Sequence, residues 1–148
     1  MLRKNAGFSL TELMVILGII ALMCGIAMPG LIGWLPKYRM GSAARDILGT
    51  LEFARMTAVK RNATTLVTLD YANDLVRVTV GANTVRTIRM PAGIDLKEPA
   101  SQSLGASFNF DSQGMVKDNK SGEVLISDGG RHPDKKVTLS SGGSIKIQ

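Results

Sequence analysis

The feature that most constrains this chain is a run of 24 uncharged residues, Leu13–Pro36, that follows a single carboxylate, Glu12. Leu, Ile, Met, Ala, Val and Gly make up most of the run. As an α-helix that rises about 1.5 Å per residue it would extend about 36 Å, whereas a hydrocarbon core is about 30 Å thick. The chain must therefore fold as a membrane-length segment followed by a separate domain.

Charge and cysteine content set limits on that domain. The net charge of +6 allows binding to nucleic acid or to an anionic surface but does not require it. The one cysteine, Cys24, lies in the apolar run, so residues 37–148 cannot form an internal disulfide or a cysteine zinc site. Arg3 and Lys4 favour a cytoplasmic N-terminus.

A second, amphipathic helix is predicted from Tyr38 to about Arg61, nearly contiguous with the first. Pro29 is expected to kink or interrupt the combined helix because proline lacks an amide hydrogen. Glu52 and Arg55 are three residues apart, and we expect them to pair on the helix surface. Apolar residues at offsets of three and four form one stripe: Ala44, Ile47, Leu48, Leu51, Ala54 and Ala58.

The rest of the chain is strand-like. Val76, Val78 and Val80 alternate with polar residues, as in a half-buried strand. We predict an α+β fold, in which a long N-terminal helix has a membrane-spanning first half and an amphipathic second half. This helix packs against an antiparallel β-sheet of about six or seven short strands. The strand-like segments are Thr64–Asp70, Leu75–Val80, Thr84–Met90, Ile94–Leu96, Ala106–Phe110, Glu123–Ser127, Lys136–Ser140 and Ser144–Ile147.

Residues that could carry catalysis or bind a metal form no recognisable set. The one histidine, His132, lies in a turn-like loop, where a surface role is expected. Asp111–Gly114 resembles the start of a calcium loop, but the later ligand positions are missing, which favours a hairpin turn. There is no P-loop, dinucleotide glycine pattern or serine-histidine-aspartate set. The sequence thus predicts no enzyme, cofactor or metal.

Glu12 has three interpretations. Ser9–Leu10–Thr11–Glu12 fits a capping box, in which Ser9 and Glu12 satisfy helix N-terminal amides. Alternatively, residues 1–27 form an ordinary signal peptide cleaved after Gly25–Ile26–Ala27, although the apolar stretch continues beyond that site. The third interpretation rests on the free energy of membrane insertion, because inserting an unpaired carboxylate into a membrane costs about 3 kcal/mol. A cut after Gly7 would create a partner for the carboxylate, a new ammonium at Phe8.

The stretch Lys4–Leu13 resembles the processing motif of type IV prepilins and type II secretion pseudopilins. The motif has a basic leader, Gly before the cut, Phe after it and Glu at the fifth mature position, and all of these occur here. The resemblance implies that a prepilin peptidase cleaves between Gly7 and Phe8 and that Phe8 is N-methylated. It also implies that Glu12 takes part in subunit docking, and Pro29 matches a proline common in these helices.

The rest of the chain resembles the GspH/FimT group of minor pseudopilins. An A-R-x-x-A stretch recurs in that group and is Ala54–Ala58 here, and an F-x-x-x-G turn is Phe110–Gly114. The resemblance implies a leader (residues 1–7), a transmembrane and polymerisation helix (8–36) and a periplasmic globular domain (37–148). It implies a single-pass inner-membrane protein that joins a periplasmic filament, with other pseudopilins or pilins, the prepilin peptidase and the inner-membrane assembly platform as partners.

Two functions within this group, and one outside it, stay open. The first is a structural subunit of the pseudopilus in a type II protein secretion system. The second is a FimT-like minor pilin of a type IV pilus involved in DNA uptake. The tail lacks the paired arginines of DNA-binding members, but a basic patch could contact DNA or another anion. It would comprise Arg131, Lys135, Lys136 and Lys146. The third is a signal-anchored periplasmic binding domain, for which Glu12 would be only a helix cap.

Overall fold

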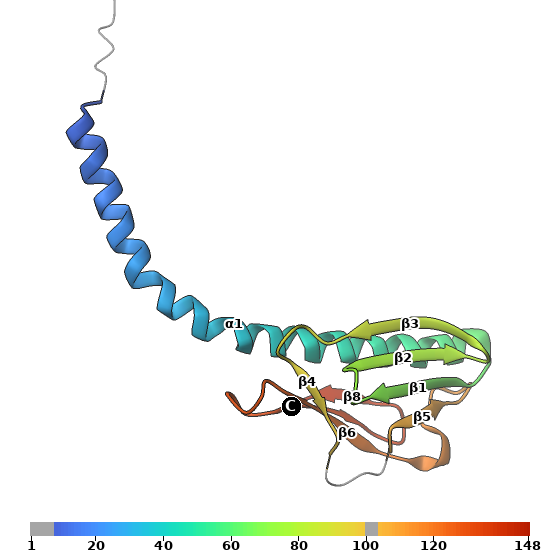
Figure 1. Cartoon of the computed structure of the whole chain (residues 1–148). Helices are drawn as coiled ribbons and strands as arrows, with labels where there is room; N and C mark the ends of the chain where they lie inside the picture. The colour runs from blue at the N-terminus through green and yellow to red at the C-terminus, as the bar shows by residue number, and fades with distance from the viewer. Residues whose placement is uncertain (1–7, 100–103) are drawn as a thin grey trace, which may run out of the picture. The chain divides into compact units, whose positions relative to one another are not determined.

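The computed structural model describes residues 8–99 and 104–148, without the side chains of residues 29–33. The leader, with Gly7, lies outside the described residues. One helix, α1, runs from Leu10 to Arg61 and joins the two helical stretches that the sequence predicted (Figure 1). It continues through Pro29, so the helix is not interrupted there, and a kink at Pro29 stays a prediction. The helix ends at Arg61, and the next residue, Asn62, has a positive φ of 47°.

The chain divides into two compact units, with the boundary between Leu35 and Pro36. The first unit contains the apolar half of α1. The second contains the amphipathic half of α1 and all described strands.

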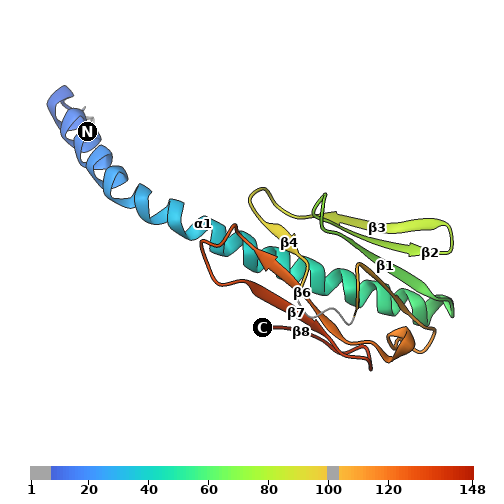
Figure 2. The ribbon, with the colours of Figure 1, turned by 60° about the horizontal axis from the view of Figure 1, so that its bottom comes forward.

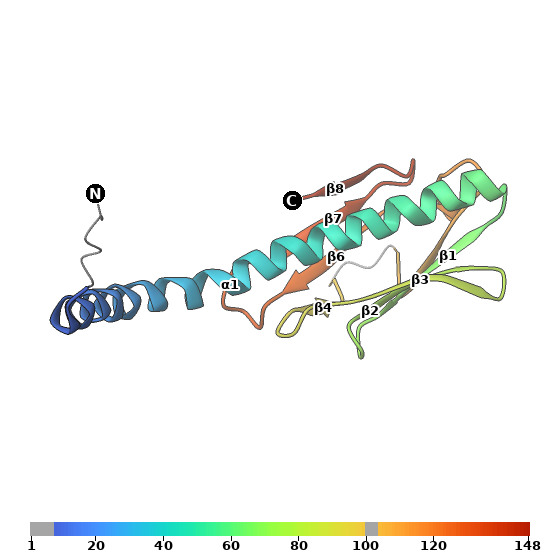
Figure 3. The same ribbon diagram turned by 90° about the horizontal axis from the view of Figure 1, so that it is seen from above.

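Eight strands in the described residues form two four-stranded antiparallel sheets, one more sheet than the sequence suggested. The first sheet has the order β3-β2-β1-β5 and the second the order β4-β6-β7-β8. Both sheets flank the second half of α1 (Figure 2 and Figure 3). The strands of the first sheet are β1 (Thr65–Asp70), β2 (Leu75–Val80), β3 (Asn83–Arg89) and β5 (Ser107–Phe110). Those of the second are β4 (Asp95–Lys97), β6 (Gly122–Ser127), β7 (Lys135–Leu139) and β8 (Ile145–Ile147).

The predicted apolar stripe of α1 faces the core. Five of its six members are buried, Leu48 is partly exposed, and Met40 and Ala43 extend the stripe toward the start of the unit. Small alanines on the helix let the sheets approach closely, and larger residues of both sheets fill the space between. These sheet residues include Val67, Val76, Val78, Phe108, Phe110, Val124, Ile126, Val137 and Leu139.

The predicted alternation in β2 holds for two of its three valines, and the pairing of β2 with β3 contains a register shift. Val76 and Val78 are buried, as predicted, but Val80 is only partly buried. The pairing of β2 with β3 shifts between Val78 and Thr79, which leaves Val85 as an extra residue on β3. Such a bulge disturbs the two-residue period of β3, whereas Val80 keeps its regular pairing with Thr65 of β1 and lies at the end of β2. A period-two pattern alone could not place the bulge.

Candidate functional site

Two residues of the processing motif, Phe8 and Glu12, lie at the N-terminal end of α1 in the described part of the chain. The Ser9 hydroxyl accepts a hydrogen bond from the Glu12 amide at 3.2 Å, which is one half of the predicted capping box. Phe8 is 77% exposed, and Glu12 is also exposed. Among the described residues, the Glu12 carboxylate forms no ion pair. The structure thus leaves a carboxylate and an aromatic side chain open at the start of an apolar helix.

The segment Leu10–Met28 of α1 packs against nothing in the part of the chain that the structure describes. Leu10–Met28 has a mean hydropathy of 2.3 and is long and apolar enough to cross a membrane, and none of this window is buried. Its exposed side chains include Leu13, Met14, Ile19, Ile20 and Leu22. Since a soluble monomer rarely leaves so much continuous apolar surface in water, this surface requires lipid or other apolar helices as its surroundings.

The two motifs that resemble the GspH/FimT group meet in space. Arg55, from the A-R-x-x-A stretch, does not form the expected pair with Glu52 among the described residues. Its Nε instead donates a hydrogen bond to the Gly114 carbonyl at 3.0 Å. Gly114 ends the F-x-x-x-G turn, in which Asp111 Oδ1 accepts from the amides of Gln113 and Met115, both at 2.9 Å. The carboxylate that resembled a calcium ligand therefore holds a turn.

Gly143, on the turn between β7 and β8, completes this junction, and its role was missed in the sequence. It has a φ of +77°, and a Cβ there would lie 2.2 Å from the Gly114 carbonyl oxygen and 3.0 Å from Arg55 Nε. The C-terminal turn is thus packed against the Arg55–Gly114 contact, backbone against backbone. We call Arg55, Gly114 and Gly143 the helix–turn junction. The Gly142–Gly143 pair was the available sequence signal, but it did not reveal what lies opposite.

His132 also has a structural partner that the sequence did not indicate. Its Nδ1 lies 2.5 Å from Oδ2 of Asp128, whose side chain is only 1% exposed. Asp128 Oδ1 accepts from the amides of Arg131 and His132, both at 3.0 Å. The hydrogen bond from the His132 ring, with those from the two amides, lowers the pKa of Asp128 despite its burial. This arrangement fixes the 128–132 loop.

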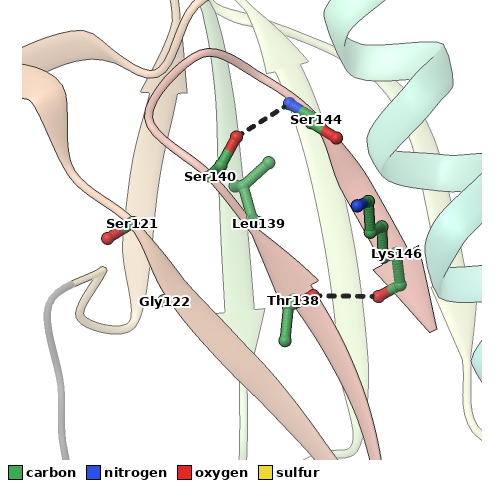
Figure 4. Close-up of a pocket in the computed structure, with 7 residues that line it drawn as sticks. All are labelled: Ser121, Gly122, Thr138, Leu139, Ser140, Ser144 and Lys146. Atoms are coloured by element: carbon green, nitrogen blue, oxygen red, sulfur yellow. Dashed lines mark hydrogen bonds between the residues drawn. The ribbon is translucent and has the colours of Figure 1, made fainter. Parts of the chain in front are cut away.

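The four residues of the predicted basic patch do not share one surface. Lys135 and Lys136 are adjacent on β7 and so point to opposite faces. Lys136 pairs with Glu123 at 3.2 Å, whereas Lys135 Nζ lies on the helix side, near Gly41. Lys146, on β8, lines a shallow hollow with Thr138 and Ser140 (Figure 4). Arg131 is exposed in the loop.

No group of three or more His, Cys, Asp or Glu side chains suited to a metal occurs in residues 8–99 and 104–148.

Sequence comparison identifies two profiles in the chain. The profile of the family described as "Type II transport protein GspH" matches residues 43–143, and that of the "Prokaryotic N-terminal methylation motif" matches residues 2–28. The first covers most of the globular unit and includes the helix–turn junction. The second covers the leader and the apolar half of α1. No curated protein sequence matches significantly.

Solved minor pilins and pseudopilins share the fold. The type IV minor pilin FimU of Pseudomonas aeruginosa superposes with a TM-score of 0.65 at 18% identity, over 76% of this chain and 90% of FimU. The minor pseudopilin EpsH from the type 2 secretion system of Vibrio cholerae superposes with a TM-score of 0.57 at 16% identity, over 74% of this chain and 96% of EpsH. At these identities the likeness establishes the pilin-like α+β fold, as the sequence predicted.

Proposed function

The chain belongs to the GspH family of type II transport proteins, and from this premise we propose that it is a structural minor pseudopilin. It assembles through its N-terminal helix into the periplasmic pseudopilus of a type II protein secretion system. The observation that carries the proposal is the apolar segment Leu10–Met28 of α1, none of which is buried in the described part of the chain. Inserted in the inner membrane, this surface faces lipid; in the filament, it packs against the helices of other subunits.

Processing creates the positively charged partner that the Glu12 carboxylate lacks. The prepilin peptidase cuts between Gly7 and Phe8 at the cytoplasmic face, and the new N-terminal ammonium of Phe8 becomes N-methylated. Methylation of an amine retains its positive charge. As the assembly platform adds a subunit, the ammonium of a neighbouring subunit meets the Glu12 carboxylate in a low-dielectric environment. The pair then fixes the axial register of the two helices.

Mass spectrometry of the membrane-extracted protein tests the processing step. We expect the mature chain to begin at Phe8 and to carry one methyl group there. An intact leader, or a chain that begins at Met28, would contradict the proposal. It would favour the signal-anchored or signal-peptide alternatives.

Two substitutions separate docking from helix capping. Glu12→Ala should reduce incorporation into filaments, measured by cross-linking to other pseudopilins, without changing the folded globular unit. Ser9→Ala removes the hydroxyl that caps the Glu12 amide and serves as the matched control. If Glu12 acts in docking, Ser9→Ala assembles normally. Equal defects in both variants would assign Glu12 to the cap alone.

The alternative within the family is a minor pilin of a type IV pilus, and the fold shared with the type IV minor pilin FimU supports this alternative. Complementation of secretion-deficient and pilus-deficient strains distinguishes the two machines. For DNA uptake, binding of the protein to duplex DNA is measured at low and at higher salt, because phosphate contacts are strongest at low salt. Absence of binding at low salt excludes the DNA role.

A further inference from the structure

A second candidate site lies beside the point where the chain leaves its apolar segment. Lys37 is the first charged residue after Glu12. It lines a cavity of about 380 Å³ in the globular unit, together with Met40, Pro133, Lys135 and Ile147. His132, Asp134 and Gln148 complete the lining. This volume is within the range of small-ligand sites. We call it the Lys37 cavity.

Positive charge is concentrated at this cavity. Lys135 Nζ and Arg45 Nη2 would lie 3.7 and 3.9 Å from a Cβ on Gly41, so the missing side chain lets two cations approach one helix position. In the described part of the chain, neither of these two cations nor Lys37 forms an ion pair with a carboxylate. Asp134, which also lines the cavity, has its carboxylate paired with Lys97 at 3.4 Å. Asp128 is held by His132 and two amides.

Arg39 does not add to this cluster, because its Nη1 donates to the Ala92 carbonyl at 3.2 Å. The Lys37 cavity therefore presents two lysines, a nearby arginine and one carboxylate that Lys97 pairs with, beside the apolar residues Met40, Pro133 and Ile147. A singly charged phosphodiester that also carries an apolar or neutral portion fits that combination.

The length of the apolar segment places Lys37, which lines this cavity, close to the level of the lipid headgroups. A hydrocarbon core of about 30 Å accommodates about 20 helical residues, so a span that starts at Leu13 ends near residue 32. Lys37 then follows about 7.5 Å further along the helix, at the outer edge of the headgroup layer, which is about 5–7.5 Å thick on each side. Lysine side chains reach toward such a layer.

We propose that the Lys37 cavity binds the phosphodiester headgroup of an anionic phospholipid while the subunit is anchored in the membrane. Lys37 and Lys135 contact the phosphate, and Arg45 adds charge from the neighbouring helix turn. The contact would hold the globular unit at the membrane surface until the subunit is extracted into a filament. The inference rests on the membrane anchoring proposed above, but not on the choice between pseudopilus and pilus.

Lysine acylation of the full-length chain tests this, with mass spectrometry as the readout. The protein is reconstituted in nanodiscs of phosphatidylcholine alone or of phosphatidylcholine mixed with phosphatidylglycerol. Lys60 is the internal control, since it is exposed on the same helix about 35 Å further along. An anionic surface favours each lysine contact by a factor of about five. We therefore expect Lys37 and Lys135 to be acylated about fivefold less in the anionic discs, with Lys60 unchanged.

Variants and a soluble anion define the outcomes. Lys135→Gln should abolish most of the lipid-dependent protection of Lys37, whereas Lys60→Gln should leave it intact. Equal protection of Lys37 in neutral and anionic discs would overturn the proposal, because simple proximity to the membrane would explain it. Protection of the detergent-solubilised chain by inorganic phosphate, without an effect of anionic lipid, would overturn the lipid assignment. Failure of the chain to insert into either disc would instead contradict the anchoring itself.

Discussion

The helix–turn junction makes a quantitative prediction for Gly143→Ala. Gly143 has a left-handed φ of +77°, and its Cβ position lies 2.2 Å from the Gly114 carbonyl oxygen. An alanine there must therefore adopt an unfavourable backbone conformation and also displace a backbone atom. Displacement of the Gly114 carbonyl would break its hydrogen bond from Arg55 Nε.

The expected loss is the sum of two effects. A non-glycine residue in the left-handed region costs about 1–2 kcal/mol. Loss of a hydrogen bond with a charged donor costs about 1.5–3 kcal/mol, toward the lower figure where the contact is partly exposed. We therefore expect Gly143→Ala to lower the free energy of unfolding by about 2.5–4 kcal/mol. A domain of this size has a total of about 5–15 kcal/mol.

Urea unfolding of residues 36–148, followed by circular dichroism, measures this loss. All buried apolar side chains of the described residues, from Met40 to Leu139, lie within this fragment. Two glycines separate the causes. Gly129 has a φ of +77° but open space around it, so Gly129→Ala should cost only the conformational term, about 1–2 kcal/mol.

Gly142 is the neighbouring control, because its φ is not left-handed and its nearest neighbour, Ser140 Oγ, lies 4.0 Å away. Gly142→Ala should change stability by less than about 0.5 kcal/mol. If Gly143→Ala cost no more than Gly129→Ala, the contact with Gly114 would not restrain the turn. The account of the junction would then be refuted.

Two further predictions concern buried polar groups. The His132 hydrogen bond lowers the pKa of Asp128 in the folded protein. The ionised carboxylate therefore contributes its whole stabilisation above the unfolded pKa of Asp, about 3.9. This stabilisation is lost as the pH falls through the lower pKa of the folded state. Asp128→Asn should thus destabilise the domain at pH 7, and the difference from wild type in urea unfolding should shrink below about pH 4; a constant difference would contradict this. Thr50 Oγ1 is buried without a hydrogen-bond partner in the described residues, so Thr50→Val should stabilise by about 1 kcal/mol in the same assay, and a loss of stability would mean that the hydroxyl is satisfied.

Most of the fold could be predicted from the sequence because its elements have strong local signals. The uncharged run, the helical stripe and the Gly- and Asp-rich turns each have one dominant period or composition. The division into two sheets had no such signal, since it depends on which strands pair. β4 pairs with β6, and β5 with β1, across long intervals of sequence. Those pairings follow from how the two sheets share one helix.

The site shows the same division between local and distant information. The processing motif is contiguous in sequence, so its residues could be named without a structure. Arg55 was assigned a partner three residues away, but its hydrogen bond is to Gly114, 59 residues further along the chain. Lys135 and Lys136 looked like one patch because they are adjacent, but a strand directs neighbours to opposite faces. The sequence could not predict side-chain partners that are set by tertiary contacts between distant segments.

The helix α1 has an exposed apolar segment and a buried segment, and substitutions in the two segments should cause different defects: loss of assembly or loss of domain stability. Side chains in Leu10–Met28 are not buried in the structure, so polar substitutions there should leave the urea unfolding of the globular unit unchanged when it is measured in the full-length, detergent-solubilised chain. Side chains such as Ile47 and Leu51 are fully buried, so their truncation to alanine should cost about 2–5 kcal/mol and impair assembly only by unfolding the domain. A variant that loses assembly while its globular unit keeps full stability therefore acts on docking. By this criterion we expect Glu12→Ala to lose assembly while its globular unit keeps full stability. A measurable loss of domain stability in that variant would contradict a docking role for Glu12.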